Sequence, residues 1–193
     1  MIDLQLNWYN AANSDLRINM TDQNVPFYNV ISITVDAIGE PGQRVFFLQA
    51  KDEDQTLSFI MEKVQVESLS VAISRLLAEV SKKKPIVDEQ DFLFDEEPMH
   101  IHPPVDPMFR IGEMGMAFEE EDQKVVLVVQ EVYFGDVTAE NARKIALRCS
   151  PRQLAALSTW AMALVTRGRP ICPYCNEPME KDHLCPKKNG HKH

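Results

Sequence analysis

Four residues near the C-terminal end constrain how this chain can fold. Cys172, Cys175, His183 and Cys185 lie in the segment CPYCNEPMEKDHLC and form the pattern C-x2-C-x7-H-x-C. A C-x-x-C pair turns the backbone so that both sulfurs face one point, and the close spacing of the His and the last Cys allows the same. Three thiolates and one imidazole are the ligand set of a tetrahedral zinc site. Because so short a tail buries little apolar surface, we expect structural zinc to order a small knuckle within residues 168–193.

Three other uses of these cysteines stay open. A C-x-x-C pair also serves as a redox centre in thioredoxin-like folds, but there it follows a strand and opens a helix, whereas here it follows a predicted helix. A disulfide framework would have to include Cys149, which lies far from the cluster in the sequence. A catalytic zinc would keep one position open, whereas four protein ligands close the shell. His191 and His193 are further donors that could join or replace a ligand.

The composition is that of a globular protein with one domain and an appendage. The chain has 193 residues, of which 45% are hydrophobic and 25% charged, and this supports a real core. No apolar run approaches the length of a membrane span, and the N-terminus carries Asp3 without a basic leader. Together with cysteines that are expected to be reduced, these features predict a cytoplasmic protein that does not associate with membranes.

Charge is unevenly distributed along the chain. The net charge is −9, but from Arg167 onward six basic residues face three acidic ones, which leaves the tail at +3 and the remainder at −12. An acidic body repels phosphate backbones, so we do not expect nucleic acid as the main partner. The basic tail could touch a nucleic acid or an acidic protein surface, or it could simply keep the chain end solvated. A protein partner of unknown identity is the expectation.

The body between the two ends contains two stretches with the same order of predicted elements. The first, residues 31–84, contains candidate strands at 31–39, 44–50 and 57–64 and a helix at about 66–82. The second, residues 108–167, contains candidate strands at 109–118, 124–134 and 142–149 and a helix at about 150–167, with Ser150 as N-cap, Pro151 in the first turn and Gly168 as C-cap. The predicted fold class is α+β, with two similar βββα halves forming one core plus the small C-terminal zinc knuckle.

The helices suggest that the two halves are an internal repeat. A shift of 85 residues places Leu69 on Leu154 and Val80 on Val165. Any two βββα stretches share such apolar patterning, so an accidental likeness stays open. The resulting domain plan is a variable N-terminal segment at 1–30, a duplicated body at 31–167 and the zinc-binding tail at 168–193.

An acidic, proline-rich linker at 85–107 separates the halves. Its composition suits a chain that is solvated or wrapped over the surface, with Phe92, Leu93 and Phe94 as anchors. His100 and His102 form an H-x-H pair beside several acids, which could bind a second metal but is better explained as a loop. If the protein is a small enzyme instead of an adaptor, we expect its site in a cleft between the halves, near these histidines, Arg44 and Gln49.

Three segments together resemble a known bacterial family. They are GEPGQRVFFLQA at 39–50, LSFIMEKVQVESL at 57–69 and GRPICPYCNEPMEKDHLCPKKNGH at 168–191. In this combination the chain is similar, from about Val35 to its end, to the uncharacterised family called domain of unknown function 3090, sometimes described as a repeat protein. The resemblance implies that the C-terminal Cys and His residues, here Cys172, Cys175, His183 and Cys185, are a family feature. It implies no activity.

Overall fold

The computed structural model describes residues 7–10, 25–83, 95–133, 135, 138, 141–168, 172–179 and 183–187. Its strands are β1 (Asn7–Asn10), β2 (Phe27–Asn29), β3 (Ser32–Ile38), β4 (Val45–Lys51), β5 (Thr56–Met61), β6 (Pro107–Glu119), β7 (Lys124–Glu131) and β8 (Lys144–Cys149). Its helices are α1 (Lys63–Lys83), α2 (Pro151–Thr166) and the short 3-10 helix η2 (Glu97–Met99). The mixed α+β class predicted from the sequence is confirmed.

The strands form one sheet whose two ends are brought together by the chain. The order is β2-β8-β7-β6-β5-β4-β3, and β1 adds to β6. Pairs β2–β8 and β5–β6 are parallel, whereas β3–β4–β5 and β6–β7–β8 are antiparallel meanders. Val30 N donates to Arg148 O at 2.9 Å and Ile31 N to Lys51 O at 2.7 Å, so these two residues join opposite ends of the strand order. The sheet must therefore curl until its ends meet.

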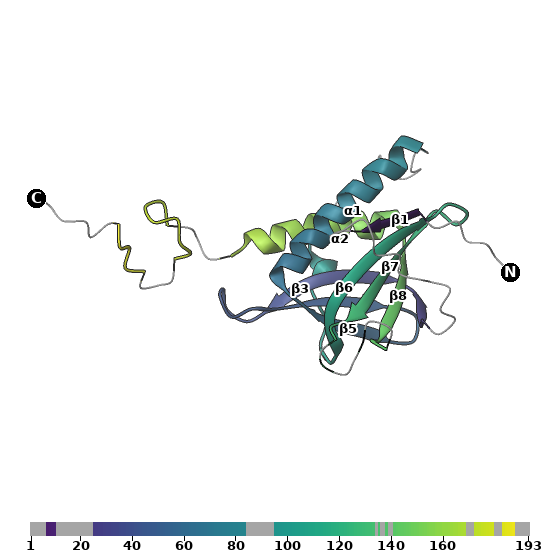
Figure 1. Cartoon of the computed structure of the whole chain (residues 1–193), viewed down its shortest axis with the longest axis horizontal. Coiled ribbons are helices and arrows are strands. Elements are labelled where there is room, and N and C mark those ends of the chain that lie inside the picture. Colours follow the sequence, from purple (N-terminus) through teal and green to yellow (C-terminus); the bar gives the residue numbers. More distant parts are fainter. Residues whose placement is uncertain are drawn as a thin grey trace, which may run out of the picture.

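Helices α1 and α2 cover one face of the curled sheet, and the core lies between these helices and the sheet (Figure 1). Apolar side chains alternate along β4, where Phe46, Leu48 and Ala50 are buried in this core. Strand β7 is buried on both faces, as its uninterrupted apolar sequence predicts for a central strand. Trp160 of α2 is fully buried, and its indole Nε1 donates to Val35 O at 2.5 Å. This bond orients α2 against β3.

Polar side chains fix the start of each long helix. At α2 the Ser150 hydroxyl accepts the Gln153 N–H, and the Gln153 side chain accepts the Ser150 N–H. These two bonds complete a capping box, and the helix starts at Pro151. The prediction of Ser150 as N-cap is confirmed. The C-cap is Arg167, one residue before the predicted Gly168. Helix α1 starts earlier than predicted because Gln65 Oε1 accepts the Glu62 N–H at 2.8 Å.

The described part of the linker, from residue 95 onward, crosses β3 and β4. Met99 is only 5% exposed, and its carbonyl accepts a hydrogen bond from the Thr34 hydroxyl. Gln49 makes two reciprocal bonds with the His102 backbone, donating to its carbonyl at 3.1 Å and accepting from its N–H at 2.9 Å. The linker is therefore packed on the body at this point. The predicted anchors Phe92–Phe94 lie outside the described residues.

No helix among the described residues is both long enough and apolar enough to cross a membrane.

Candidate metal centre

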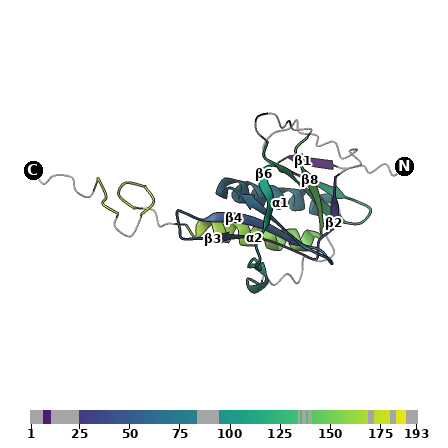
Figure 2. The same ribbon diagram turned by 90° about the horizontal axis from the view of Figure 1, so that it is seen from below.

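The tail that follows α2 builds two short turns that carry the ligands. The first turn closes when Asn176 N donates to Cys172 O at 2.9 Å and Cys172 N donates to Glu177 O at 2.8 Å. Asn176 has a φ of 61°, a left-handed conformation that asparagine tolerates better than most residues. The second turn carries His183 and Cys185. Seen from below, the tail continues from the end of α2 on the side of the β3–β4 turn (Figure 2).

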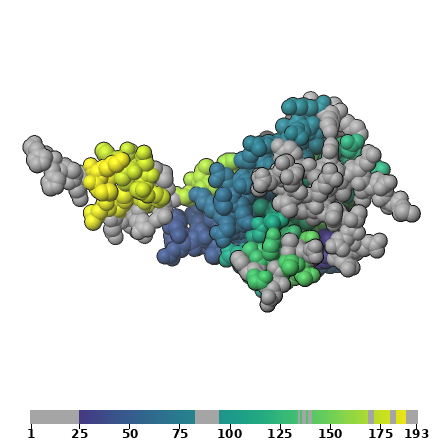
Figure 3. All heavy atoms as spheres, in the orientation of Figure 1, coloured from purple at the N-terminus to yellow at the C-terminus, as the bar shows by residue number. Residues whose placement is uncertain are grey.

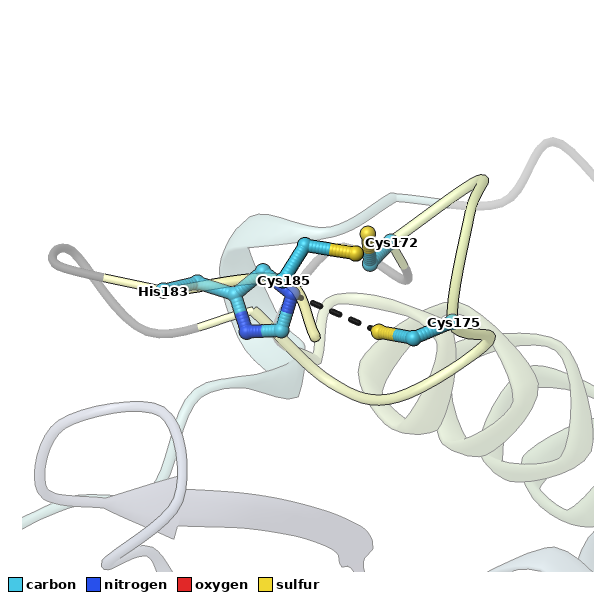
Figure 4. A group of neighbouring side chains, drawn as sticks. All are labelled: Cys172, Cys175, His183 and Cys185. Atoms are coloured by element: carbon cyan, nitrogen blue, oxygen red, sulfur yellow. Dashed lines mark hydrogen bonds between the residues drawn. The ribbon is translucent and has the colours of Figure 1, made fainter. Parts of the chain in front are cut away.

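The four predicted ligands converge on one point. The three sulfurs and one histidine ring nitrogen all lie within 4.8 Å of one another. Figure 4 shows the side chains of both turns directed toward each other, with Cys175 Sγ and His183 Nε2 at 3.4 Å. Cys172 is 2% exposed and Cys185 is 5% exposed, whereas Cys175 and His183 are half-buried. This group could hold a metal ion.

The local backbone prepares one sulfur for a cation. The Cys175 N–H points at the Cys172 sulfur and lowers the pKa of Cys172 to about 6, against the opposing effect of burial and with help from the Tyr174 N–H. Burial raises the pKa of Cys175 instead. Thiolates are the metal-binding form of cysteine, so the lowered pKa of Cys172 favours binding of a cation. All four cysteines of the chain are free of disulfide bonds.

The sequence as a whole was compared with known proteins. The model of one family, described as a protein of unknown function (DUF3090), matches residues 26–185. The chain belongs to the DUF3090 family. The match begins within the described N-terminal part of the sheet, upstream of the residues that carry the resemblance, and ends at the last cysteine of the cluster. No curated protein and no solved structure gives a match.

Among the described residues of this DUF3090 protein, the other candidates do not join into a second group of three or more ligands. His100 Nδ1 lies 3.1 Å from Asp36 Oδ2, whereas the His102 backbone is engaged by Gln49. Arg44 lies elsewhere, with Nη1 donating to Arg167 O at 2.8 Å. Within the described parts of the chain, no other group of three or more Cys, His, Asp and Glu ligand atoms converges as the tail cluster does. His191 and His193 lie outside those parts.

Cys149 lies apart from the cluster, in an environment that disfavours the reactive thiolate. It is fully buried at the end of β8, and burial raises its pKa to about 12. A thiol in this environment is an inert part of the core.

Sequence reasoning missed the partners of His100. Its ring packs edge-on against Trp160 with centroids 5.1 Å apart, and Arg167 stacks on the same indole at 4.7 Å. Arg167 also forms a forked ion pair with Glu96 at 2.8 and 3.0 Å. These contacts join the linker to the end of α2. The contacts of His100 with Trp160 and of Glu96 with Arg167 span 60 and 71 positions of the chain, so no local spacing signals them.

Proposed function

We propose that this protein carries one structural zinc ion in its tail and acts by binding another protein, without catalysis. The donor set supports zinc, since soft thiolates with one imidazole in a tetrahedral arrangement are typical of structural zinc sites. Zinc bonds to sulfur and nitrogen would place a thiolate and an imidazole about 3.5 Å apart. The separation of 3.4 Å between Cys175 Sγ and His183 Nε2 fits that value. Four protein donors leave no position for a substrate.

The binding role is supported by two exposed apolar side chains, one in each of the two ligand turns. Each ligand pair encloses a large apolar residue, Tyr174 between the first cysteines and Leu184 between the histidine and the last cysteine. Tyr174 is 58% exposed and Leu184 is 84% exposed. In the space-filling view the tail forms a small lobe beyond the body (Figure 3). Zinc would hold both side chains rigid at its surface, so that a partner gains contact area at little entropic cost.

The proposed compartment is the cytoplasm. Free cysteines and a zinc-thiolate centre require reducing conditions, because an oxidising compartment would convert neighbouring thiols to disulfides. The proposed partner is a protein rather than a nucleic acid, since the chain outside the tail carries −12 and the exposed tail residues Tyr174 and Leu184 offer apolar contact area.

We also propose that the body arose by duplication of one βββα unit. Two reciprocal sets of contacts support this. Ser70 Oγ donates to Ser158 O at 2.8 Å, and Ser158 Oγ donates to Ser70 O at 2.9 Å, across an interval of 88 residues. Such an exchange of identical bonds is what a local two-fold relation between α1 and α2 produces.

The helix-capping glutamines repeat the pattern at the same interval. Gln65 Nε2 donates to the carbonyls of Ile111 and Gly112 at 3.0 and 3.2 Å, where β6 passes the start of α1. Gln153 Nε2 donates to the carbonyls of residues 30 and 31 at 2.9 and 2.7 Å, at the junction of β2 and β3. The parallel pairs β5–β6 and β8–β2 occupy corresponding places. This correspondence of 88 residues in the helices replaces the offset of 85 predicted from apolar patterning, and it pairs Leu69 with Leu157.

The zinc centre is tested by elemental analysis of the purified full chain. We expect about one zinc per chain in the wild type, and loss of it in Cys175→Ser and Cys185→Ser, because each substitution removes a ligand. Cys149→Ala is the matched control and should retain the metal. Limited proteolysis should cut the tail of the two ligand variants while the body remains intact. Wild-type protein without zinc, or full zinc in Cys185→Ser, would refute the proposal.

The binding role is tested with the double variant Tyr174→Ala and Leu184→Ala. Because neither residue is a ligand, this variant should keep its zinc, which elemental analysis checks. We expect a partner captured from native lysate by the wild type to be lost both from the double variant and from chelator-treated wild type. A partner retained equally by all three proteins would show that the tail surface is not the binding site.

A further inference from the structure

A pocket of about 310 Å³ lies between the body and the tail. Its walls come from the β3–β4 turn, the first residue of α1, the end of α2 and Pro178 of the tail. The floor is apolar, because Phe46 and Leu164 face it, and these side chains are only 7% and 5% exposed. The size falls at the lower end of the range for small-molecule sites.

The described lining of the pocket carries two positive charges and no negative one. Among the described residues that line it, only Arg44 and Lys63 are charged, although the whole chain is acidic at −9. The described ion pairs include neither residue. Arg44 makes one bond, to the Arg167 carbonyl, which leaves most of its five N–H groups without a described acceptor. An anion entering the pocket would therefore meet donors that no carboxylate of the described chain neutralises.

Lys63 occupies a position that is unfavourable for a cation. It is the first residue of α1, where the helix dipole is positive. The first turn contains no acid, and the preceding Glu62 is paired with Arg110. A cation placed at the start of a helix is less favourable than a neutral residue. A residue type that disfavours the local helix start is expected where the residue serves a binding site instead. Lys63 Nζ lies close to Gly168, 3.4 Å from where a Cβ on that glycine would be, so the ammonium sits at the pocket wall.

The second half of the body serves as an internal comparison, on the basis of the duplication proposed above. At the helix interval of 88 residues, Lys63 corresponds to Pro151, which starts α2. The registers of β3–β4 and β6–β7 likewise match Arg44 with Gln123, one residue before β7. Neither counterpart is charged. The βββα unit folds with neutral residues at both positions, so the two cations are a feature of this pocket and not of the fold.

We propose that this pocket binds a small organic oxyanion, namely a phosphate monoester or carboxylate with a short apolar body. The anionic group would lie between Arg44 and Lys63, and the apolar body would lie on Phe46 and Leu164. Pro178 closes one side, and it belongs to the segment between the ligand pairs. In this respect the inference rests on the proposed zinc centre, because the zinc would fix Pro178 over the pocket and link ligand affinity to metal content.

The test uses phenyl phosphate as the probe and the full, metal-loaded chain. Calorimetry should show saturable binding, and backbone amide resonances of residues 41–46 and 63–65 should shift. A charge-assisted contact is worth about a 10- to 100-fold change in affinity, so Lys63→Gln should weaken binding by at least tenfold. Lys51→Gln is the matched control, since Lys51 is exposed at the opposite end of β4, and it should bind within about twofold of the wild type.

The outcomes separate this inference from the proposed zinc centre. Loss of affinity on chelation, together with the loss in Lys63→Gln, supports both. Binding that depends on Lys63 but survives chelation keeps the oxyanion pocket and removes only the link to zinc. Absence of saturable binding, or equal binding by Lys63→Gln, Lys51→Gln and the wild type, overturns the inference whatever the metal content is.

Discussion

Gln153 joins three parts of the body, so its replacement is a sharp test of the fold. Its Oε1 accepts the Ser150 N–H at 2.7 Å and completes the cap of α2. Its Nε2 donates to the carbonyls of Val30 and Ile31 at 2.9 and 2.7 Å, at the point where the sheet curls from β2 into β3. Gln153→Ala removes all three bonds and leaves the helix propensity of the position intact.

The expected loss can be worked from these bonds. A neutral hydrogen bond contributes about 0.5–1.5 kcal/mol net, and loss of a capping interaction costs about 1 kcal/mol. The side chain is half-buried and one of the two bonds to the junction is exposed to solvent, so water replaces part of what is removed. We therefore expect the free energy of unfolding to fall by about 2 kcal/mol. For a chain of this size that corresponds to a melting temperature lower by about 4–8 °C.

Urea denaturation followed by circular dichroism measures the effect. The exposed Gln55 in the β4–β5 turn provides the control, and Gln55→Ala should change stability by less than about 0.5 kcal/mol. Gln65→Ala should cost about as much as Gln153→Ala, because Gln65 makes the equivalent three bonds in the first half. A loss below about 0.5 kcal/mol for Gln153→Ala would refute the reasoning, and a large difference between the two glutamines would count against the duplication.

Two further predictions concern single positions. A Cβ on Gly112 would lie 2.8 Å from Val132 Cα, so Gly112→Ala should lower the free energy of unfolding by about 2 kcal/mol in urea denaturation. Gly168→Ala is the control and should be near neutral, because a Cβ there meets only Lys63 Nζ at 3.4 Å and a carbonyl at 3.8 Å. A neutral Gly112→Ala would contradict this. Because burial raises the pKa of Cys149 to about 12, the neutral thiol stabilises the fold below about pH 9, and this contribution is lost as pH rises toward 12. At pH 8, Ellman's reagent should therefore label Cys149 about 1,000-fold more slowly in the folded chain than in urea, and equal rates would disprove it.

The sequence was most informative where the signal is local. The ligand spacing identified the four residues that converge in the tail, since two short turns suffice to bring each pair together. The N-terminal cap of α2 was predictable from Ser150 and Pro151 for the same reason. Strand and helix order followed from apolar periodicity, because the period of burial is set by each element's own geometry.

Only the tertiary structure decided how those elements are joined. The curled sheet depends on Val30 and Ile31 bonding to strands from opposite ends of the order, and nothing within their neighbourhood encodes this. The interval of 88 residues that we propose for the duplication rests on the bonds of Ser70 and Ser158, because apolar residues at helical spacing look alike at several offsets. The pocket likewise joins residues of the β3–β4 turn, both long helices and the tail, which no local pattern groups together. The ligand pairs and the helix cap depend on residues a few positions apart in the sequence. Strand register and the lining of the pocket depend on side chains that come from distant parts of the chain.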